Sequence, residues 1–305
     1  MELPPLPPAD DVFTALKLTV LPAAGAAAFV YALFLSAGRW AGLFGSAVAV
    51  LAGLAYANWL ELRLPWNPER VAWEWLPRAA AAMVLIGLVS RCIGFGMDRL
   101  VGTGRWWWLA NGFVWLPRVG VAIVVAFWLV PERVREPEPW LLPTFAATML
   151  LEWIILDGVA RGGRGVSVAF SQAVMLMGCS AVILYSHSAR FMEVSTMAGA
   201  ALFGIGVVAR VARTTGLSGC IPAGVVLLPG LILSTKLGTE SHVPAAAYYL
   251  VALAPLGLAP WCIPALARRR GWVSTAFQLA AVAVPIAIAV ILAGQSETLP
   301  WEEEW

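Results

Sequence analysis

The character of the whole chain is already visible in the stretch Trp140–Gly165, WLLPTFAATMLLEWIILDGVARGGRG. It contains an apolar run long enough to cross a bilayer as an α-helix. A carboxylate, Glu152, lies well inside that run, and Asp157, Arg161 and Arg164 follow near its end. Because an ionised group in hydrocarbon is costly unless it has a partner or a water-filled cavity, the stretch predicts a membrane-spanning helix whose carboxylate faces protein.

Two hydroxyl residues belong to the same helix face as this carboxylate. Thr144, Thr148 and Glu152 are spaced four apart, so they line one stripe of an α-helix. Polar stripes on membrane helices face neighbouring helices and not lipid. We therefore expect the stripe to lie inside a helical bundle.

The composition of the chain agrees with a membrane protein throughout. The 305 residues are 60% hydrophobic and 12% charged, with a mean hydropathy of +0.80. Globular chains are about half apolar and about a quarter charged. The net charge of +2 and the absence of a long basic tail give no indication of nucleic-acid binding. The expected class is all-α, a polytopic integral membrane protein in one bundle.

Ten apolar segments are predicted to cross the membrane. They are 12–36, 41–60, 79–97, 112–130, 140–158, 166–186, 191–211, 220–235, 243–267 and 273–294. Together they form one transmembrane domain, 12–294, flanked by an acidic, proline-rich tail, 1–11, and an acidic tail, 295–305. The first tail lacks the basic region of a cleavable signal peptide, so we expect the first helix to be retained.

The basic residues predict which way the helices run. With ten spans, one side receives Arg39, Arg91, Arg99, Arg105, Arg161, Arg164, Arg210, Arg213 and Arg268–Arg270. The positive-inside rule assigns that side to the cytoplasm. Both termini are then extracytoplasmic, and the expected location is a bacterial inner membrane.

Small residues and tryptophans predict packing and interface positions. Gly45, Ala49, Gly53 and Ala57 form a ladder that allows close helix approach, as do Thr196, Ala200 and Gly204. Residues 68–76 are expected to form a short helix in the outer interface. Trp106–Trp108 are expected at the inner headgroup level.

Prolines predict broken helices late in the chain. Pro222, Pro229 and Gly230 interrupt the segment 220–235, and four more prolines fall within 243–267. A break frees backbone groups at membrane depth, which transporters use to bind substrate. Kinked helices that only pack are the alternative interpretation.

Counting residues from the predicted inner ends reveals one polar layer. Arg91, Arg118, Glu152 and Gln172 each lie about 9 Å from the inner boundary, on four consecutive helices. We expect Arg118 and Glu152 to be ion-pair partners, because a guanidinium matches a carboxylate. Three interpretations are open: a structural ion-pair network, arginines that extend to the interface, or an anion or proton-coupled site. The layer and Thr148 are the candidates for substrate or ion binding.

The remaining motifs favour no catalytic centre and no metal. His187 and His242 fall near the outer ends of spans without ligand spacing, so they are only weak candidates for a metal or haem site. The four cysteines, Cys92, Cys179, Cys220 and Cys262, lack paired metal-type spacing. The basic loop Gly158–Gly165 lacks a nucleotide-binding pattern, and the sequence has no GxSxG motif. The sequence leaves the cofactor, if the protein has one, unknown.

Three function classes fit these observations. The leading hypothesis is a transporter of a small solute or an ion, with its polar site in the inner half of the bilayer. The alternatives are a structural or accessory subunit that binds a membrane-protein partner or a second copy, and a membrane enzyme acting on lipid-linked substrate. Membrane lipids are expected partners in every case.

Overall fold

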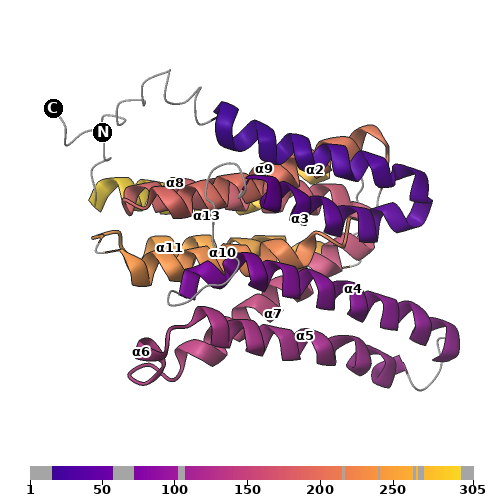
Figure 1. Cartoon of the computed structure of the whole chain (residues 1–305), viewed down its shortest axis with the longest axis horizontal. Coiled ribbons are helices and arrows are strands. Elements are labelled where there is room, and N and C mark those ends of the chain that lie inside the picture. Colours follow the sequence, from indigo (N-terminus) through magenta and orange to yellow (C-terminus); the bar gives the residue numbers. More distant parts are fainter. Residues whose placement is uncertain are drawn as a thin grey trace.

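The computed structural model describes residues 16–57, 72–101, 107–214, 217–239, 241–263, 266 and 271–296. Within these ranges every regular element is helical, and the helices lie side by side in one bundle (Figure 1). Seven of them are long and apolar enough to cross a membrane. The chain is therefore a helical, multi-pass membrane protein, as the composition predicted.

The elements alternate between long α-helices and short helical turns. In chain order they are η1 (Leu16–Val20), α2 (Leu21–Phe34), η2 (Leu35–Trp40), η3 (Ala41–Gly45), α3 (Ser46–Ala57), η5 (Ala72–Trp75), α4 (Leu76–Val101), α5 (Trp107–Leu129), α6 (Glu132–Arg135), α7 (Leu141–Val159), η6 (Ala160–Arg164), α8 (Gly165–Tyr185), α9 (Ala189–Val211), α10 (Ile221–Gly238), α11 (Ala245–Ala252), η7 (Ala254–Cys262) and α13 (Trp272–Ser296).

Each of the ten predicted segments overlaps at least one of these helices. The seven candidate spans count the stretch Leu141–Tyr185 once, and they leave out the shorter apolar helices Leu21–Phe34 and Gly42–Tyr56. A bundle of ten crossings therefore stays a prediction.

Some predicted features fall wholly or partly outside the described residues. These are the tail 1–11, most of the tail 295–305, Trp106, Arg105, Arg268–Arg270 and the first part of the expected interfacial helix 68–76. Its described part, η5, is a single 3₁₀ turn that leads directly into α4. That part is therefore the entrance to a span and not a separate helix.

Successive helices run in opposite directions, so the links between them meet at two ends of the bundle. Helix α4 ends, and α5 begins, at the end of the bundle opposite to α6 (Figure 1). The hydroxyls of Tyr31, on α2, and Thr214, after α9, lie 2.9 Å apart. Arg164, before α8, donates to the carbonyl oxygen of Leu266, after η7, at 2.8 Å. We call the end of the bundle that holds these two contacts the arginine-rich end.

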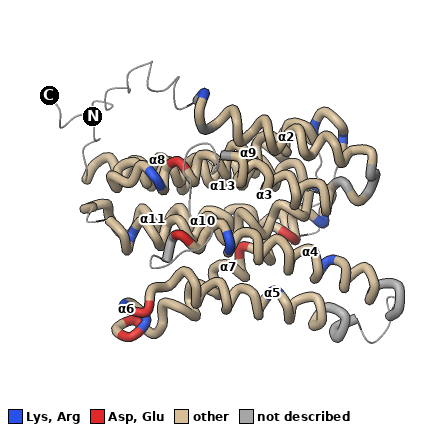
Figure 2. The backbone as a smooth tube through the Cα atoms, in the orientation of Figure 1, with Lys and Arg blue, Asp and Glu red and all other residues tan. Residues whose placement is uncertain are grey.

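Contacts at the opposite end confirm the alternation. Tyr248 of α11 lies 2.6 Å from the hydroxyl of Ser186, after α8, and 3.2 Å from that of Ser241, after α10. The acidic residues of α6 and its flanks are also at this end (Figure 2). The described links that were predicted to share one side of the membrane therefore share one end of the bundle.

Helix α10 lies at the centre of the bundle (Figure 1). All its residues from Ile221 to Leu233 are buried, as expected for a helix that is apolar on every side. The break predicted at Pro229 and Gly230 is wrong, because α10 runs through both residues as one α-helix. Membrane helices tolerate an internal proline when neighbouring groups satisfy the freed backbone carbonyl.

The break occurs in the next segment. Helix α11 ends at Ala252, and the 3₁₀ segment η7 continues to Cys262 with Pro255 in its first turn and Pro260 inside. Prolines remove backbone donors that an α-helix requires, so the prolines of 243–267 and not those of 220–235 change the helix type.

Glycine makes two features of the fold possible. Gly163 takes φ 78°, a left-handed conformation, and thereby separates α7 from α8 with a kink. Gly53 on α3 lies so close to α2 and α9 that a Cβ there would stand 2.9 Å from the carbonyl oxygen of Ala23 and 2.8 Å from Ala201. The small-residue ladders therefore serve close packing, as predicted.

Candidate functional site

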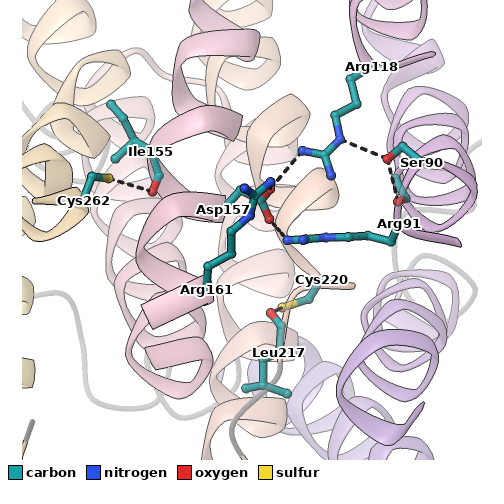
Figure 3. Close-up of polar contacts among 10 residues, drawn as sticks. Ser90, Arg91, Arg118, Ile155, Asp157, Arg161, Leu217, Cys220 and Cys262 are labelled. Carbon is teal, nitrogen blue, oxygen red and sulfur yellow. Dashed lines mark hydrogen bonds and ion pairs between the residues drawn. The ribbon is translucent and has the colours of Figure 1, made fainter. Parts of the chain in front are cut away.

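The most polar buried feature of the bundle is centred on Asp157, in the last turn of α7 at the arginine-rich end. Its carboxylate pairs with three guanidiniums that come from three helical elements: Arg91 on α4, Arg118 on α5 and Arg161 on η6. Figure 3 shows the three side chains pointing toward Asp157. We call these four residues the arginine–aspartate cluster.

The geometry of the cluster gives each guanidinium its own contact. The Nη1 of Arg118 lies 3.0 Å from Oδ2 of Asp157, and the Nη2 of Arg161 lies 3.1 Å from the same oxygen. Arg91 contacts the other oxygen, Oδ1. Both carboxylate oxygens are therefore engaged, and Asp157 itself is only 2% exposed.

Arg118 is the most enclosed of the three arginines. Its Nε donates to the hydroxyl of Ser90 at 3.0 Å, and that hydroxyl donates in turn to the carbonyl oxygen of Gly87 at 2.9 Å. The rings of Trp115 and Trp153 lie 4.5 Å and 4.9 Å from its Cζ, within the range of cation–π attraction. These contacts fix Arg118 in a single position.

The three arginines of the cluster differ in exposure. The side chain of Arg118 is 1% exposed, that of Arg91 20% and that of Arg161 51%. Three guanidiniums share one carboxylate, so the cluster as a whole is positive. The excess positive charge is therefore accessible from the arginine-rich end, and an arrangement of this kind attracts anions.

The predicted ion pair between Arg118 and Glu152 is wrong, because Arg118 pairs with Asp157. The reason is the direction of the side chains. A Cα–Cβ bond tilts toward the start of its helix, and α5 starts at the arginine-rich end. The long side chain of Arg118 therefore leads from its own depth toward that end, where Asp157 lies, and not toward the deeper Glu152.

Glu152 and Gln172 lie together next to the cluster. Both line a small void against Gly224 and Leu228 of α10 that has no room for a water molecule. The Nε2 of Gln172 donates to the carbonyl oxygen of Ile221 at 3.1 Å. Oε1 of Glu152 and Oε1 of Gln172 have no hydrogen-bond partner among the described residues. The four residues of the predicted layer therefore form two adjacent groups. Arg91 and Arg118 contact Asp157, and Glu152 lies with Gln172.

The threonines of the predicted stripe belong to neither group. Thr148 donates to the carbonyl oxygen of Thr144 at 2.9 Å, and Thr144 donates to that of Trp140 at 2.7 Å. Thr144 is exposed and Glu152 is buried, so the expectation that the whole stripe faces the inside is wrong. Each threonine satisfies its hydroxyl within its own helix instead.

The residues proposed as helix breakers are packing residues. A Cβ at Gly87 of α4 would lie 2.6 Å from Cγ of Pro222, and one at Gly230 would lie 2.7 Å from Leu76. Pro222, Pro229 and Gly230 are all buried within α10. Their contacts bring α10 close to α4.

The histidines lie at the opposite end of the bundle. His187 is in the turn after α8, and His242 precedes α11. Within the described ranges no three His, Cys, Asp or Glu side chains gather closely enough to hold a metal ion. The described residues therefore give no support to a metal site at His187 or His242.

Asp157 is the functional candidate that the depth count omitted. One signal in the sequence pointed to it, since Asp157 and Arg161 are spaced i, i+4 on a helix and such pairs meet.

The chain matches no protein-family model, and no characterised protein is similar to it in sequence.

Proposed function

We propose that this membrane protein binds a small anionic solute at the arginine–aspartate cluster and carries it across the bilayer. The observation that supports the proposal is the charge imbalance of the cluster: three guanidiniums around one carboxylate, with Arg91 and Arg161 increasingly exposed. A structural ion pair needs one base for each acid. The additional guanidiniums supply the bidentate donors that carboxylate, sulfate and phosphate groups prefer.

The proposed path continues from the cluster into the bundle. Glu152 lies about 7.5 Å deeper than Asp157 along α7, and it shares its void with Gln172. A carboxylate at this depth requires a cation, a proton or water to offset its charge. We propose that Glu152 exchanges a proton as the anion passes, which couples transport to a proton.

The proposal includes ten crossings. A straight helix over Leu141–Tyr185 would be about 68 Å long, more than twice the hydrocarbon thickness. The kink at Gly163 divides it into two helices of normal length, α7 and α8. The shorter α2 and α3 are each preceded by a helical turn that lengthens them.

The proposed location is a bacterial inner membrane, with both termini extracytoplasmic and the arginine-rich end in the cytoplasm. In that orientation the arginine–aspartate cluster opens to the cytoplasm. Anions of the cytoplasm would reach Arg161 first.

One observation favours the alternative, an accessory subunit of a membrane assembly or homo-oligomer. Arg118 is enclosed by Asp157, Ser90 and two tryptophan rings, and the void at Glu152 admits no water. A closed cluster of this type can fix helix positions without binding a solute.

Transport by the purified protein in proteoliposomes tests the proposal. The solutes are chloride, sulfate, inorganic phosphate and a short-chain carboxylate, each with and without an imposed proton gradient. We expect uptake of at least one anion above that of protein-free vesicles, faster with the gradient. Arg161→Gln should raise the solute concentration needed for half-maximal uptake, and Arg91→Gln should lower uptake about tenfold, since a charged hydrogen bond is lost.

Arg133→Gln is the matched control, because Arg133 is an exposed arginine at the opposite end. It should leave uptake unchanged. If no anion is taken up and none raises the unfolding temperature of the wild-type protein, the transport proposal fails and the accessory role is the better explanation.

A further inference from the structure

A second basic site lies at the arginine-rich end, apart from the arginine–aspartate cluster. It is an open cavity of about 550 Å³ between the first turn of α8, the last turn of α9 and the first turn of α13. Arg164, Arg210 and Arg213 line it, and no acidic residue is among the described residues of its lining. Phe170 and Leu279 lie on its inner, apolar wall. The cavity thus combines a positive rim with an apolar wall.

We propose that this cavity binds the phosphate group of an anionic phospholipid. The three guanidiniums hold the phosphate, and an acyl chain lies along Phe170 and Leu279. Guanidiniums suit phosphate because they offer paired donors in one plane. The inference is independent of the proposed transport function, since it uses none of the residues of the arginine–aspartate cluster.

The three arginines differ in how they are held. Arg164 is only 8% exposed, and its Nη2 donates to the carbonyl oxygen of Leu266 at 2.8 Å. It forms a fixed base to the cavity. Arg210 and Arg213 are exposed, so their side chains are able to close over a headgroup that has entered.

The backbone of Arg213 is unusual. It takes φ 53°, in the left-handed region, directly after the cap of α9. Glycine is the usual residue at this position of a helix end, and other residues are uncommon there. An arginine at this place is costly for the helix end, and phosphate binding gives it a role that outweighs the cost.

The start of α13 adds further donors. The backbone N–H of Thr275 bonds the carbonyl oxygen of Gly271, so the N–H groups of the residues between them are the unpaired donors of a helix start. Gly271, Trp272 and Ser274 all line the cavity. Trp272 is 75% exposed, as is common for tryptophan at the headgroup level of a bilayer. These features favour a ligand that lies in the membrane interface.

Native mass spectrometry of the full chain tests the inference. The protein is released from micelles that contain equal amounts of phosphatidylglycerol and phosphatidylcholine with matched acyl chains. We expect one phosphatidylglycerol to be retained in preference to phosphatidylcholine. Arg210→Gln and Arg213→Gln should each lower its retention about tenfold, since each removes a charged donor, whereas Arg133→Gln should not change it.

Arg213→Gly separates a binding role from a structural one. Because glycine suits φ 53°, this variant should unfold at the same or a higher temperature than the wild type, yet retain less phosphatidylglycerol. A residue that only capped α9 would show no loss of lipid.

Competition with inorganic phosphate identifies the source of the phosphate group. If millimolar inorganic phosphate does not displace the lipid, the ligand is the phospholipid, as proposed. Equal retention of both lipids, unchanged retention in the arginine variants, or displacement by phosphate alone overturns the assignment to a phospholipid.

Discussion

At the level of single residues, one carboxylate shared by three guanidiniums is an asymmetric arrangement. The loss of the acid affects all three ion pairs, whereas the loss of one base affects a single pair. Removing one partner of a buried pair also leaves the other charge without compensation. Asp157 and Arg161 should therefore respond very differently to substitution.

Asp157→Asn should lower the free energy of unfolding by about 3–5 kcal/mol, because it leaves the buried Arg118 without its carboxylate. Arg161→Gln should lower it by less than about 1 kcal/mol, since half of that side chain is in solvent. Thermal unfolding in detergent, followed by tryptophan fluorescence, measures both. Equal losses for the two variants would mean that Asp157 does not hold the cluster together.

The sequence predicted this cluster only in part. Arg91 and Arg118 are neighbours, since both contact Asp157, and counting along the helices brought them together because the rise of a helix per residue is constant. The partner was wrong because residue counting gives the depth of a Cα atom. A guanidinium lies several bonds away from its Cα, in a direction set by the tilt of the helix's side chains. Asp157 lies nearer the end of α7 than Glu152 does, and it is the carboxylate that the guanidinium of Arg118 contacts.

At the level of the helices, contact between α2 and α9 depends on glycine. A Cβ on Gly204 would overlap the backbone of Ala24, whereas a Cβ on Gly25 would meet nothing within 4 Å. The backbone of a neighbouring helix cannot move aside as a side chain can. The two glycines therefore form a matched pair for testing helix packing.

Gly204→Ala should lower the free energy of unfolding by about 1–3 kcal/mol, the usual range for overpacking. Gly25→Ala should be neutral or stabilising by up to about 1 kcal/mol, because alanine is the better helix former. Unfolding of the two purified variants in the same detergent measures the difference. A smaller loss for Gly204→Ala than for Gly25→Ala would contradict the packing of α2 against α9.

The helix types explain why the proline pattern misled. The sequence placed the break at Pro229, the proline in the interior of α10. Its surroundings are entirely buried, and neighbouring helices hold α10 in shape. The segment after α11 has Pro255 and Pro260 within one short stretch and becomes a 3₁₀ helix. The number of prolines alone does not decide whether an α-helix is interrupted. The packing around each proline decides it, and packing is not visible in one sequence.

At the level of the whole molecule, the charge distribution sets the expected orientation. The links at the arginine-rich end include Arg161, Arg164, Arg210 and Arg213, whereas α6 and its flanks at the other end are rich in glutamate. Basic links remain in the cytoplasm during insertion. The difference in charge between the two ends predicts which side of the membrane each end faces.

Cysteine labelling in intact cells tests the orientation. In a background without the four native cysteines, Glu136→Cys should react with a membrane-impermeant maleimide added outside, and Arg213→Cys should react only after the cells are opened. Both positions are exposed. Labelling of Arg213→Cys in intact cells would reverse the orientation.

The helical bundle itself was predictable, because hydrophobic runs of bilayer length can be read directly from the sequence. Each of the ten predicted segments overlaps a helix of the described residues for that reason. The cavity at Arg164, Arg210 and Arg213 was not predictable. Its walls come from α8, α9 and α13, and only the packing of distant helices brings these together.

The 3₁₀ segment η7 has a consequence for the length of the chain. A 3₁₀ helix rises about 2.0 Å per residue and an α-helix about 1.5 Å. Ala245–Cys262 is 18 residues long, so as a continuous α-helix it would extend only about 27 Å. With η7 wound as a 3₁₀ helix, the same residues reach about 30 Å, the thickness of the hydrocarbon core. The two prolines thus allow a segment of only 18 residues to match the thickness of the hydrocarbon core.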